Sequence, residues 1–558
     1  MSNKTLSDVQ RVIKETDIIN EASGNAYSFT PEHALAQLAS TGCLYPTYYA
    51  SAETQLGDVL QLASRCDIEY LAQVAVYSDE KAYMKDMPAL LTVFIAAKAA
   101  IAAEKEKAIR TAYMKAQHSG EAKSVLDTLY SDLKEANKNA FNYKDILLRV
   151  FPRVINTSKK LRNFVQILRS GVCNKKSVGS TIKKLITQWF NHRTADDIFR
   201  FSVGKSPSMA DVLSIAHPRP NNQEKNALFG WLLGREFDPN NLPPLLKQFE
   251  GWKKGQASLP DVPFEMLTAQ PLTDQQWKEI ARNAGWTWTR MNLNTMLRHK
   301  VFDDPEMVEL VAKKLSDRTI IQKVKVFPYQ LLAAYLNVDP EIPNEIKEAL
   351  GKAVEISTEN VVSFGGKVYV FVDVSGSMNS AVTGYRKGVT SKMRCVDVAA
   401  LIASVILRRN SDAKVIPFDT GIHKIELSPD RPILENAKVL AINGGGTNCS
   451  VPLAYLNSRD EEGDLIIYVS DNESWVDGRP HRYGTNVMSE WIRWRERNPQ
   501  SKLVCIDLAP HKTTQAYERE DILNIGGFSD TVFDVIARFA KNELDPDHWV
   551  SEIKAISL

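Results

Sequence analysis

The spacing of hydrophobic positions changes about two thirds of the way along the chain. Through the first 355 residues, apolar side chains recur at i, i+3 and i+4, a pattern that predicts one amphipathic helix after another. Gly, Pro, Asn and Asp in the short connections favour turns between paired helices. The predicted helices are Leu56–Tyr77, Pro88–Gln117, Glu121–Asn137, Lys159–Ser170, Thr181–Asn191, Met209–Ala216, Gln223–Leu233, Leu245–Trp252, Asp274–Asn283, Asp304–Ser316, Tyr329–Tyr335 and Asn344–Ile356. Without a crisp repeat period, helix spacing alone indicates a solenoid-like array of helix pairs.

Beyond residue 362 the pattern becomes an alternation of short apolar runs and helices. Four runs rich in β-branched and aromatic residues predict buried strands: Lys367–Val374, Ala413–Phe418, Asp464–Ser470 and Lys502–Leu508. Helices are predicted at Lys392–Arg409, Pro432–Val439, Val487–Glu496 and Thr531–Asn542. This order is typical of a parallel, doubly wound sheet. We therefore predict a multidomain α and α/β protein, with a helical module over residues 1–361 and an α/β domain over 362–558.

Composition adds limits to this picture. The 558 residues are 44% hydrophobic and 24% charged, which is ordinary for a globular protein. The most apolar stretch, Pro88–Ala103, is short and contains Lys98, so a membrane span is not expected. The N-terminal residues are polar and lack the apolar core of a signal peptide. The six cysteines are far apart and form no CxxC pair, which favours reduced thiols and a cytoplasmic location.

Positive charge is concentrated in one region. The net charge of the chain is +2, yet residues 141–220 hold 15 basic and 4 acidic side chains. Such a stretch indicates a surface for a polyanion. Equally, it could be a solvated helical face with counter-charges folded nearby, because sequence shows the density of charge and not its direction.

Five short oxygen-bearing side chains predict a metal site. Asp373, Ser375 and Ser377 form a DxSxS motif after the first strand of the α/β domain, Thr447 lies in a GGGTN loop, and Asp471 follows a later strand. All are expected at the carboxyl ends of parallel strands, where open α/β sheets bind ligands. Carboxylate and hydroxyl oxygens suit a hard divalent cation, Mg²⁺ before Mn²⁺ or Ca²⁺. The set resembles the metal-ion-dependent adhesion site of von Willebrand factor A (vWA) domains, whose usual work is binding, so no catalytic residue is predicted.

Several segments of the helical module resemble the Ro ribonucleoprotein family. The sequences are TGCLYPTYYAS (Thr41–Ser51), SMADVLSIAHPRP (Ser208–Pro220), TRMNLNTMLRHKVF (Thr289–Phe302) and KVFPYQLLAAY (Lys325–Tyr335). In the second domain GGGTNCSVPL, VSDNESW and NIGGFSDTVFDVIARF look like the family's counterparts. The resemblance implies a TROVE module, a ring of HEAT-like helical repeats, followed by the vWA (Rossmann-like) domain.

That resemblance also implies RNA partners. Members bind small structured noncoding RNAs (Y RNAs) on the outer surface and take single-stranded 3′ ends of misfolded RNA into the central hole, and an exoribonuclease can be tethered through the RNA. No membrane or DNA partner is expected. His217 falls on an RNA-contacting histidine and Arg219 stands for a family lysine, whereas Gly204 replaces a frequent arginine beside Lys205. The RNA-contact candidates are Lys159, Lys160, Arg162, Arg169, Lys183, Lys184, Arg200, Lys205, His217 and Arg219.

A polar set near the expected inner side of the ring gives weaker candidates for single-strand contacts. It comprises Asn292, Asn294, Arg298 and His299, with Trp286 and Trp288 nearby as stacking or core residues. The favoured function is thus a non-enzymatic RNA-binding scaffold in noncoding-RNA quality control. The alternative is a metal-dependent protein-interaction scaffold acting through the vWA domain. A nuclease is the least favoured, because two-metal nucleases use more carboxylates.

Overall fold

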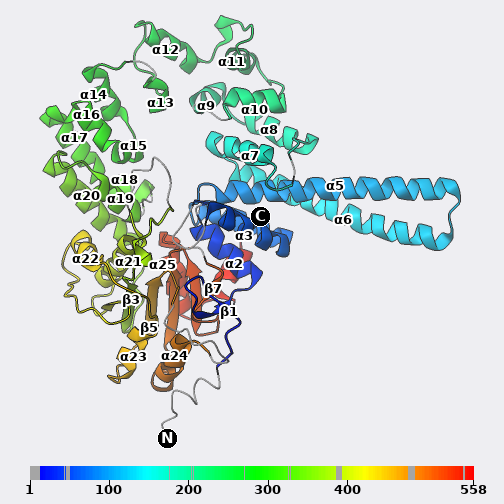
Figure 1. Cartoon of the computed structure of the whole chain (residues 1–558). Helices are drawn as coiled ribbons and strands as arrows, with labels where there is room; N and C mark the ends of the chain where they lie inside the picture. The colour runs from blue at the N-terminus through cyan, green and yellow to red at the C-terminus, as the bar shows by residue number, and fades with distance from the viewer. Residues whose placement is uncertain are drawn as a thin grey trace. The chain divides into compact units, whose positions relative to one another are not determined.

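The computed structural model describes residues 13–42, 44–45, 51–174, 176–202, 204, 207–268, 271–324, 326, 328–384, 393–474, 484–509, 511–544 and 547–558. These residues form two compact units. One comprises residues 63–80, 84–272 and 556–558, and the other comprises the N-terminal 62 residues, 81–83 and 273–555. Figure 1 colours both along the chain. The predicted domain boundary at residue 361 stays a prediction.

The first unit is built from helices. They are α4 (Ile68–Glu80), α5 (Met87–Ser119), α6 (Lys123–Val154), α7 (Ser158–Ser170), α8 (Ser180–Asn191), α9 (Ala195–Arg200), α10 (Met209–Ala216), α11 (Gln223–Leu233), α12 (Pro244–Lys253) and α13 (Phe264–Leu267), with a 3₁₀ turn at Pro239–Asn241. Each buries one apolar stripe. In α7, for example, Leu161, Phe164, Val165 and Leu168 are buried while the intervening polar side chains face outward.

Helices α5 and α6 form a long antiparallel hairpin, which we call the arm. Gly120 ends α5 in the left-handed conformation, with φ of 71°, and allows the reversal. Burial is concentrated at the base, from Met87 to Ala99 in α5 and from Ile146 to Val154 in α6. The remainder projects beyond α7 and α8 (Figure 1). Among the described residues α5 alone is long and apolar enough to cross a membrane, but 61% of its most apolar window is buried, as in a core helix.

The second unit combines helices with two sheets. Its helices before the large sheet are α2 (Pro31–Thr41), most of α3 (Ala52–Arg65), α14 (Asp274–Asn283), α15 (Trp286–Met291), α16 (Leu293–Arg298), α17 (Pro305–Leu315), α18 (Arg318–Val324), α19 (Pro328–Asn337) and α20 (Asn344–Ser357). A small antiparallel sheet joins β1 (Ile18–Ile19) and β2 (Asn25–Ser28) to β7 (Thr513–Thr514).

The large sheet has five parallel strands in the order β4-β3-β5-β6-β8. They are β3 (Val368–Asp373), β4 (Lys414–Phe418), β5 (Leu465–Ser470), β6 (Lys502–Asp507) and β8 (Ile522–Gly526), and β3 and β5 are buried along their whole length. The helices are α21 (Cys395–Arg409), α22 (Ile433–Leu440), α23 (Val451–Asn457), α24 (Asn486–Arg497), α25 (Asp530–Ala540) and α26 (His548–Lys554). The predicted helical region followed by a doubly wound α/β domain is confirmed.

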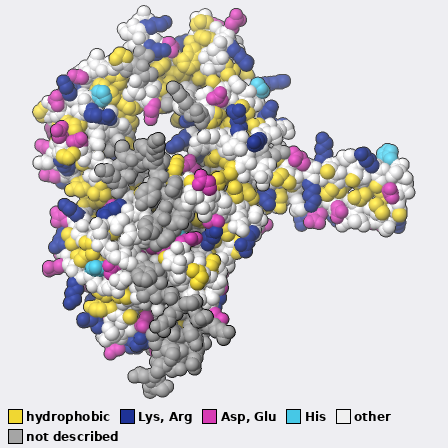
Figure 2. Space-filling model, in the orientation of Figure 1, with side chains coloured by type: hydrophobic (Ala, Val, Ile, Leu, Met, Phe, Trp, Pro, Cys, Tyr) yellow, Lys and Arg dark blue, Asp and Glu magenta, His cyan; other side chains and the backbone are white. Residues whose placement is uncertain are grey.

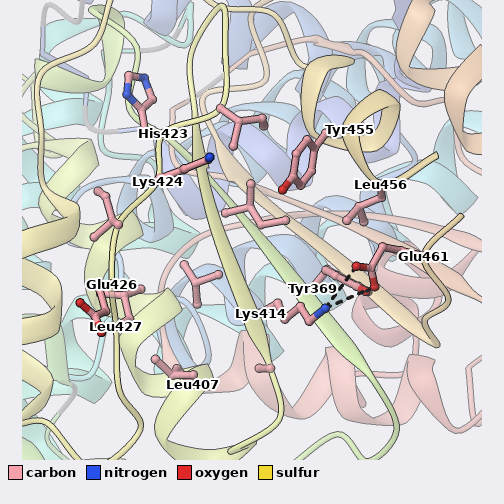
Figure 3. Close-up of a pocket in the computed structure, with 15 residues that line it drawn as sticks. Tyr369, Leu407, Lys414, His423, Lys424, Glu426, Leu427, Tyr455, Leu456 and Glu461 are labelled. Carbon is pink, nitrogen blue, oxygen red and sulfur yellow. Dashed lines mark hydrogen bonds and ion pairs between the residues drawn. The ribbon is translucent and has the colours of Figure 1, made fainter. Parts of the chain in front are cut away.

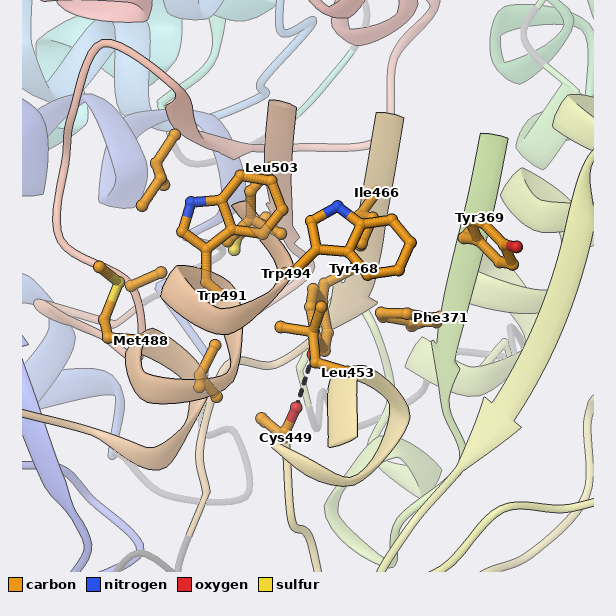
Figure 4. Packing of buried hydrophobic residues seen from close by; sticks show 14 of the residues in the cluster. Tyr369, Phe371, Cys449, Leu453, Ile466, Tyr468, Met488, Trp491, Trp494 and Leu503 are labelled. Atoms are coloured by element: carbon orange, nitrogen blue, oxygen red, sulfur yellow. Dashed lines mark hydrogen bonds between the residues drawn. The ribbon is translucent and has the colours of Figure 1, made fainter. Parts of the chain in front are cut away.

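Aromatic side chains fill the space between α24 and the sheet. Trp491 and Trp494 are fully buried and lie over strand residues that include Tyr369 and Phe371 (Figure 4). The indole N–H of Trp491 donates to the Asp521 carboxylate at 2.9 Å, so the polar atom of this large side chain is satisfied. This packing fixes the sheet whose carboxyl edge carries the predicted metal site.

Candidate functional site

The local backbone brings the DxSxS motif and the glycine loop together. Strand β3 ends at Asp373, and the loop after it is joined to the 444–447 loop by two backbone bonds. The N–H of Gly444 donates to the Val374 carbonyl at 2.7 Å, and that of Gly376 donates to the Gly445 carbonyl at 2.7 Å. A Cβ at Gly444 would lie 2.5 Å from the Val374 oxygen, so this approach requires glycine.

Four of the five predicted metal ligands form one hydrogen-bonded cluster. The Asp373 carboxylate accepts from the Ser375 N–H at 2.9 Å and from the Ser470 hydroxyl at 2.5 Å. The hydroxyl oxygens of Ser375 and Ser377 are 3.2 Å apart, and Ser377 also hydrogen-bonds to Asp471. Neighbouring parallel strands β3 and β5 place the two carboxylates at one edge. Thr447 is 3% exposed on the attached loop, but no described side-chain contact joins it to the cluster.

Burial makes negative charge costly at this cluster. It raises the pKa of Asp373, and burial together with the Asp373 carboxylate raises the pKa of Asp471 to about 7. Two buried carboxyl groups with adjacent hydroxyl oxygens fit a hard divalent cation, because the cation would neutralise the charge that burial disfavours. The residues present therefore fit the predicted metal. Its binding stays a prediction.

Two further carboxylates border the cluster and were not predicted. Asp419 accepts from the Gly445 N–H at 2.9 Å and lies 3.1 Å from His423 Nε2. Burial opposes ionisation of Asp419, but hydrogen bonds from Gly445, Gly421 and His423 outweigh it and lower its pKa. Glu473 is fully buried, accepts from the Thr513 hydroxyl at 3.0 Å, and has its pKa raised to about 8 by burial and the Asp471 charge. Only the motif SDNE hinted at Glu473.

The basic candidates lie mainly on α7 and α8. Lys183 and Lys184 are exposed on α8, while Ile182, Leu185, Ile186 and Trp189 are buried on its opposite side. Lys159 and Arg169 are exposed on α7. Figure 2 shows Lys and Arg side chains gathered over these two helices. The predicted projection of Lys183 and Lys184 from the polar face is confirmed.

Other candidates are already engaged within the fold. Lys160 pairs with the buried Asp79 at 2.5 Å, and Arg200 pairs with the exposed Asp261 at 3.0 Å. Burial lowers the pKa of Arg162, and a side chain at Gly204 would overlap its guanidinium. Arg162 thus occupies the space where the family often has arginine. Lys205 lies outside the described residues.

The motif around His217 is a helix end. Ser208 caps α10 in a capping box with Asp211, and His217 follows the last turn in the left-handed conformation, with φ of 49°. Both His217 and Arg219 are exposed. The exposed imidazole therefore stands at a fixed turn beyond α10, which packs against α7 and α8.

The predicted inner polar set is tied into local structure. Asn294 donates to the Asn337 carbonyl at 2.8 Å and accepts from the Asp339 N–H at 2.9 Å. Asn292 donates to the Trp288 carbonyl at 2.9 Å, and Arg298 hydrogen-bonds to Thr295 at 3.2 Å. The His299 ring stacks on Trp277 with centroids 3.8 Å apart. The buried Trp286 donates to the Leu315 carbonyl, which makes it a core residue.

A separate hollow of about 550 Å³ lies along β4, the edge strand of the large sheet. Ile416, Ile422 and Leu456 contribute apolar walls, and Lys414 and Glu461 lie at one end (Figure 3). Hydrogen bonds from Tyr369 at 2.6 Å and Lys367 at 3.0 Å lower the pKa of Glu461 to about 2. Glu461 is therefore held as a carboxylate by its neighbours, and none of the predicted metal ligands lines this hollow.

Comparison with known proteins agrees with this geometry. Residues 367–540 match the family model described as the Ro60 vWA domain. RNA-binding protein RO60 of Deinococcus radiodurans is 24% identical over 574 aligned residues, which cover 95% of this chain and 97% of that protein. The chain is a member of the Ro family.

Two further matches describe how this Ro-family chain compares with others. RNA-binding protein RO60 of Caenorhabditis elegans is 22% identical over 184 residues, 31% of the chain and 28% of that protein. The crystal structure of the Deinococcus radiodurans Ro (RSR) protein matches with a TM-score of 0.59 and 19% identity, covering 92% of this chain and all of that one. The latter shows that the fold is shared.

Proposed function

We propose that this Ro-family chain binds RNA through α7, α8 and the end of α10. The observation that carries the proposal is the exposed pair Lys183 and Lys184 on the polar face of a helix whose other face is buried. Lys159, Arg169 and His217 add exposed basic or polar groups on packed neighbouring helices. Phosphate neutralisation needs cations gathered on such a face, and two relatives are named RNA-binding proteins.

The RNA that best suits this surface is a small structured noncoding RNA of the Y RNA kind. Recognition would depend on shape and phosphate contacts, with weak sequence preference. From the family resemblance we also propose that single-stranded 3′ ends of misfolded RNA enter a central hole, and that the complex works in the cytoplasm as a scaffold for RNA quality control. An exoribonuclease tethered through the RNA would carry out degradation, so the chain needs no catalysis of its own.

We further propose that Asp373, Ser375, Ser377, Thr447 and Asp471 hold a divalent cation, with Mg²⁺ as the preferred ion. A bound cation would supply a positive centre that can take an acidic group from a partner. The chain's own residues position the oxygens and neutralise that centre. Asp419 supports the site from the second layer by holding the Gly445 N–H.

Binding of a labelled stem–loop RNA by the full-length chain tests the RNA surface. The variant is Lys183→Glu/Lys184→Glu/His217→Asn, because asparagine tolerates the left-handed backbone at position 217. The matched control is Lys123→Glu/Lys134→Glu, which reverses two exposed charges on the arm. The affinity should fall steeply in the first variant only. Equal binding by the wild type and both variants would exclude this surface.

The alternative is a protein-interaction scaffold that acts through the vWA domain, and the buried oxygen cluster is the observation in its favour. Asp373→Ala separates the two functions. Loss of co-purifying proteins with RNA affinity unchanged would assign partner capture to the metal centre. Unchanged partners would leave the RNA-binding role as the better account.

A further inference from the structure

A cavity of about 520 Å³ lies between the arm and the start of α8. We call it the arm-base cavity. The small side chains of Ala96, Ala99, Ala100 and Ala103 line it on the α5 side, and α6 lines it with Ala140 and Leu147. Because methyl groups leave room above the helix surface, this wall is shallow, apolar and wide enough for a flat group.

Phe141 at the cavity is an unusual side chain for a helix of a folded protein. It is 75% exposed, more than any other large hydrophobic side chain among the described residues. Leaving a phenyl ring in water forgoes roughly 2 kcal/mol that burial would contribute. An exposed ring beside an alanine wall offers one flat face to a ligand, and nucleic-acid bases stack on such faces.

Cations surround the same cavity. Lys107 and Lys144 line it and make no ion pair among those described. Arg110 is oriented by Glu106 at 2.6 Å and by the Asn137 side chain at 3.1 Å. With Glu104 and Glu106 counted, the lining keeps a net positive charge. This excess complements a phosphate group better than a carboxylate-rich protein surface with no aromatic plane.

The start of α8 strengthens the attraction for an anion. Its N-cap is Gly179, which has no side chain to accept a hydrogen bond from the first turn. The backbone N–H groups of that turn carry the positive end of the helix dipole, and Ser180 and Thr181 add hydroxyl groups to the cavity lining. Helix N-terminus, lysines and exposed ring therefore converge on one space.

We propose that the arm-base cavity binds an unpaired nucleotide of single-stranded RNA. The base stacks on Phe141 over the alanine wall, and Lys107, Lys144 and the α8 N-terminus contact its phosphates. The proposal rests on the proposed RNA-binding function and extends it from the predicted surface of α7 and α8 onto the arm. It assigns a recognition role to Phe141, Lys107 and Lys144.

The test compares two probes with the full-length chain: a labelled stem–loop RNA with a single-stranded oligouridine 3′ tail, and the same stem–loop without the tail. Phe141→Ala should weaken binding of the tailed RNA about tenfold, the loss typical for one stacked base, and leave the blunt RNA unchanged. Lys107→Glu/Lys144→Glu should weaken binding and lower the salt dependence by about one released cation per phosphate contact.

Matched controls come from the arm itself. Tyr130 is another exposed aromatic residue of α6, at 59% exposure, and does not line the cavity. Tyr130→Ala should bind both RNAs as the wild type does, and so should Lys123→Glu/Lys134→Glu. Thermal melting followed by circular dichroism should show intact folding of all variants, because the replaced side chains are exposed.

Three results would overturn the proposal. One is Phe141→Ala binding the tailed RNA like the wild type while Lys183→Glu/Lys184→Glu/His217→Asn loses it, which leaves the RNA-binding function intact elsewhere. Another is Phe141→Ala keeping both RNAs but losing a co-purifying protein, which would make the cavity a protein-docking surface. The last is a wild-type chain that binds neither RNA, which removes the RNA-binding function itself.

Discussion

Replacing Gly444 by alanine is a sharp test of how the glycine loop builds the metal centre. The added Cβ would lie 2.5 Å from the Val374 oxygen and 2.8 Å from Asp419 Oδ2. Neither atom can yield freely, because the first is backbone and the second accepts the Gly445 N–H. The loop must therefore move away from the DxSxS segment, and Thr447 moves with it.

The size of the effect follows from the bonds that such a movement breaks. Two backbone hydrogen bonds join the loop to Val374 and Gly376, and one bond from Gly445 reaches the Asp419 carboxylate. Ordinary hydrogen bonds contribute about 1 kcal/mol each, and those to charged groups about 1.5–3 kcal/mol. Gly444→Ala should therefore lower the unfolding free energy by roughly 3–5 kcal/mol.

Urea denaturation with and without Mg²⁺ measures both consequences. The matched control is Gly421→Ala, since a Cβ there meets open space and keeps the N–H bond to Asp419. Gly421→Ala should retain the wild-type midpoint, whereas Gly444→Ala should lose stability and any Mg²⁺-dependent gain. A Gly444→Ala variant as stable as the wild type, with the same response to Mg²⁺, would refute the account of the loop.

Three other predictions concern the same unit. Mg²⁺ should raise the melting temperature of the wild type but not of Asp373→Asn, and equal shifts in scanning calorimetry would argue against the proposed ligand. Burial lowers the pKa of His33 from 6.5 to about 4, so the stability contributed by its neutral form is present above pH 6.5 and is lost as the pH falls towards 4. The loss should reach about 3 kcal/mol, and His33→Phe should remove this part of the pH dependence; an unchanged pH profile would contradict it. Asn294→Ala should cost about 1–2 kcal/mol, because the bonds to Asn337 and Asp339 are lost, and should leave RNA affinity unchanged; a selective loss of RNA affinity would instead return Asn294 to the RNA-contact candidates.

Sequence periodicity located most helices because their ends carry local signals. The predicted helix Met209–Ala216 is confirmed at both ends, where Ser208 and Asp211 form the capping box. The prediction of one helix over Leu56–Tyr77 was wrong: α3 ends at Arg65 and α4 begins at Ile68. The Asp67 carboxylate accepts the Glu69 N–H at 2.7 Å and starts a new helix within an unbroken apolar pattern.

Elements that depend on distant contacts were missed. Strand β8 is short and contains Asn524, so its apolar run was too weak to predict, although it completes the parallel sheet. The pairing of Tyr27 with Thr514 joins positions far apart in sequence, which no local pattern can show. The length of α6 was also underestimated, because its second half is exposed on one side and interrupted by polar residues.

The candidate metal centre was more predictable than the RNA surface. A strand followed by a fixed DxSxS spacing places Asp373, Ser375 and Ser377 almost by covalent geometry alone. Basic residues carry no such constraint, and only the fold shows that Lys160 pairs with Asp79 whereas Lys183 faces solvent. Asp419 was missed because its contact with the glycine loop depends on strand order.

The most direct test of the central claim is crosslinking and sequencing of RNA bound to the full-length chain in its host, beside Lys183→Glu/Lys184→Glu/His217→Asn. The account predicts one or a few enriched small structured RNAs in the wild type and their loss in the variant. Absence of any enriched RNA in the wild type would contradict the account and leave the vWA domain, with its protein partners, as the functional centre.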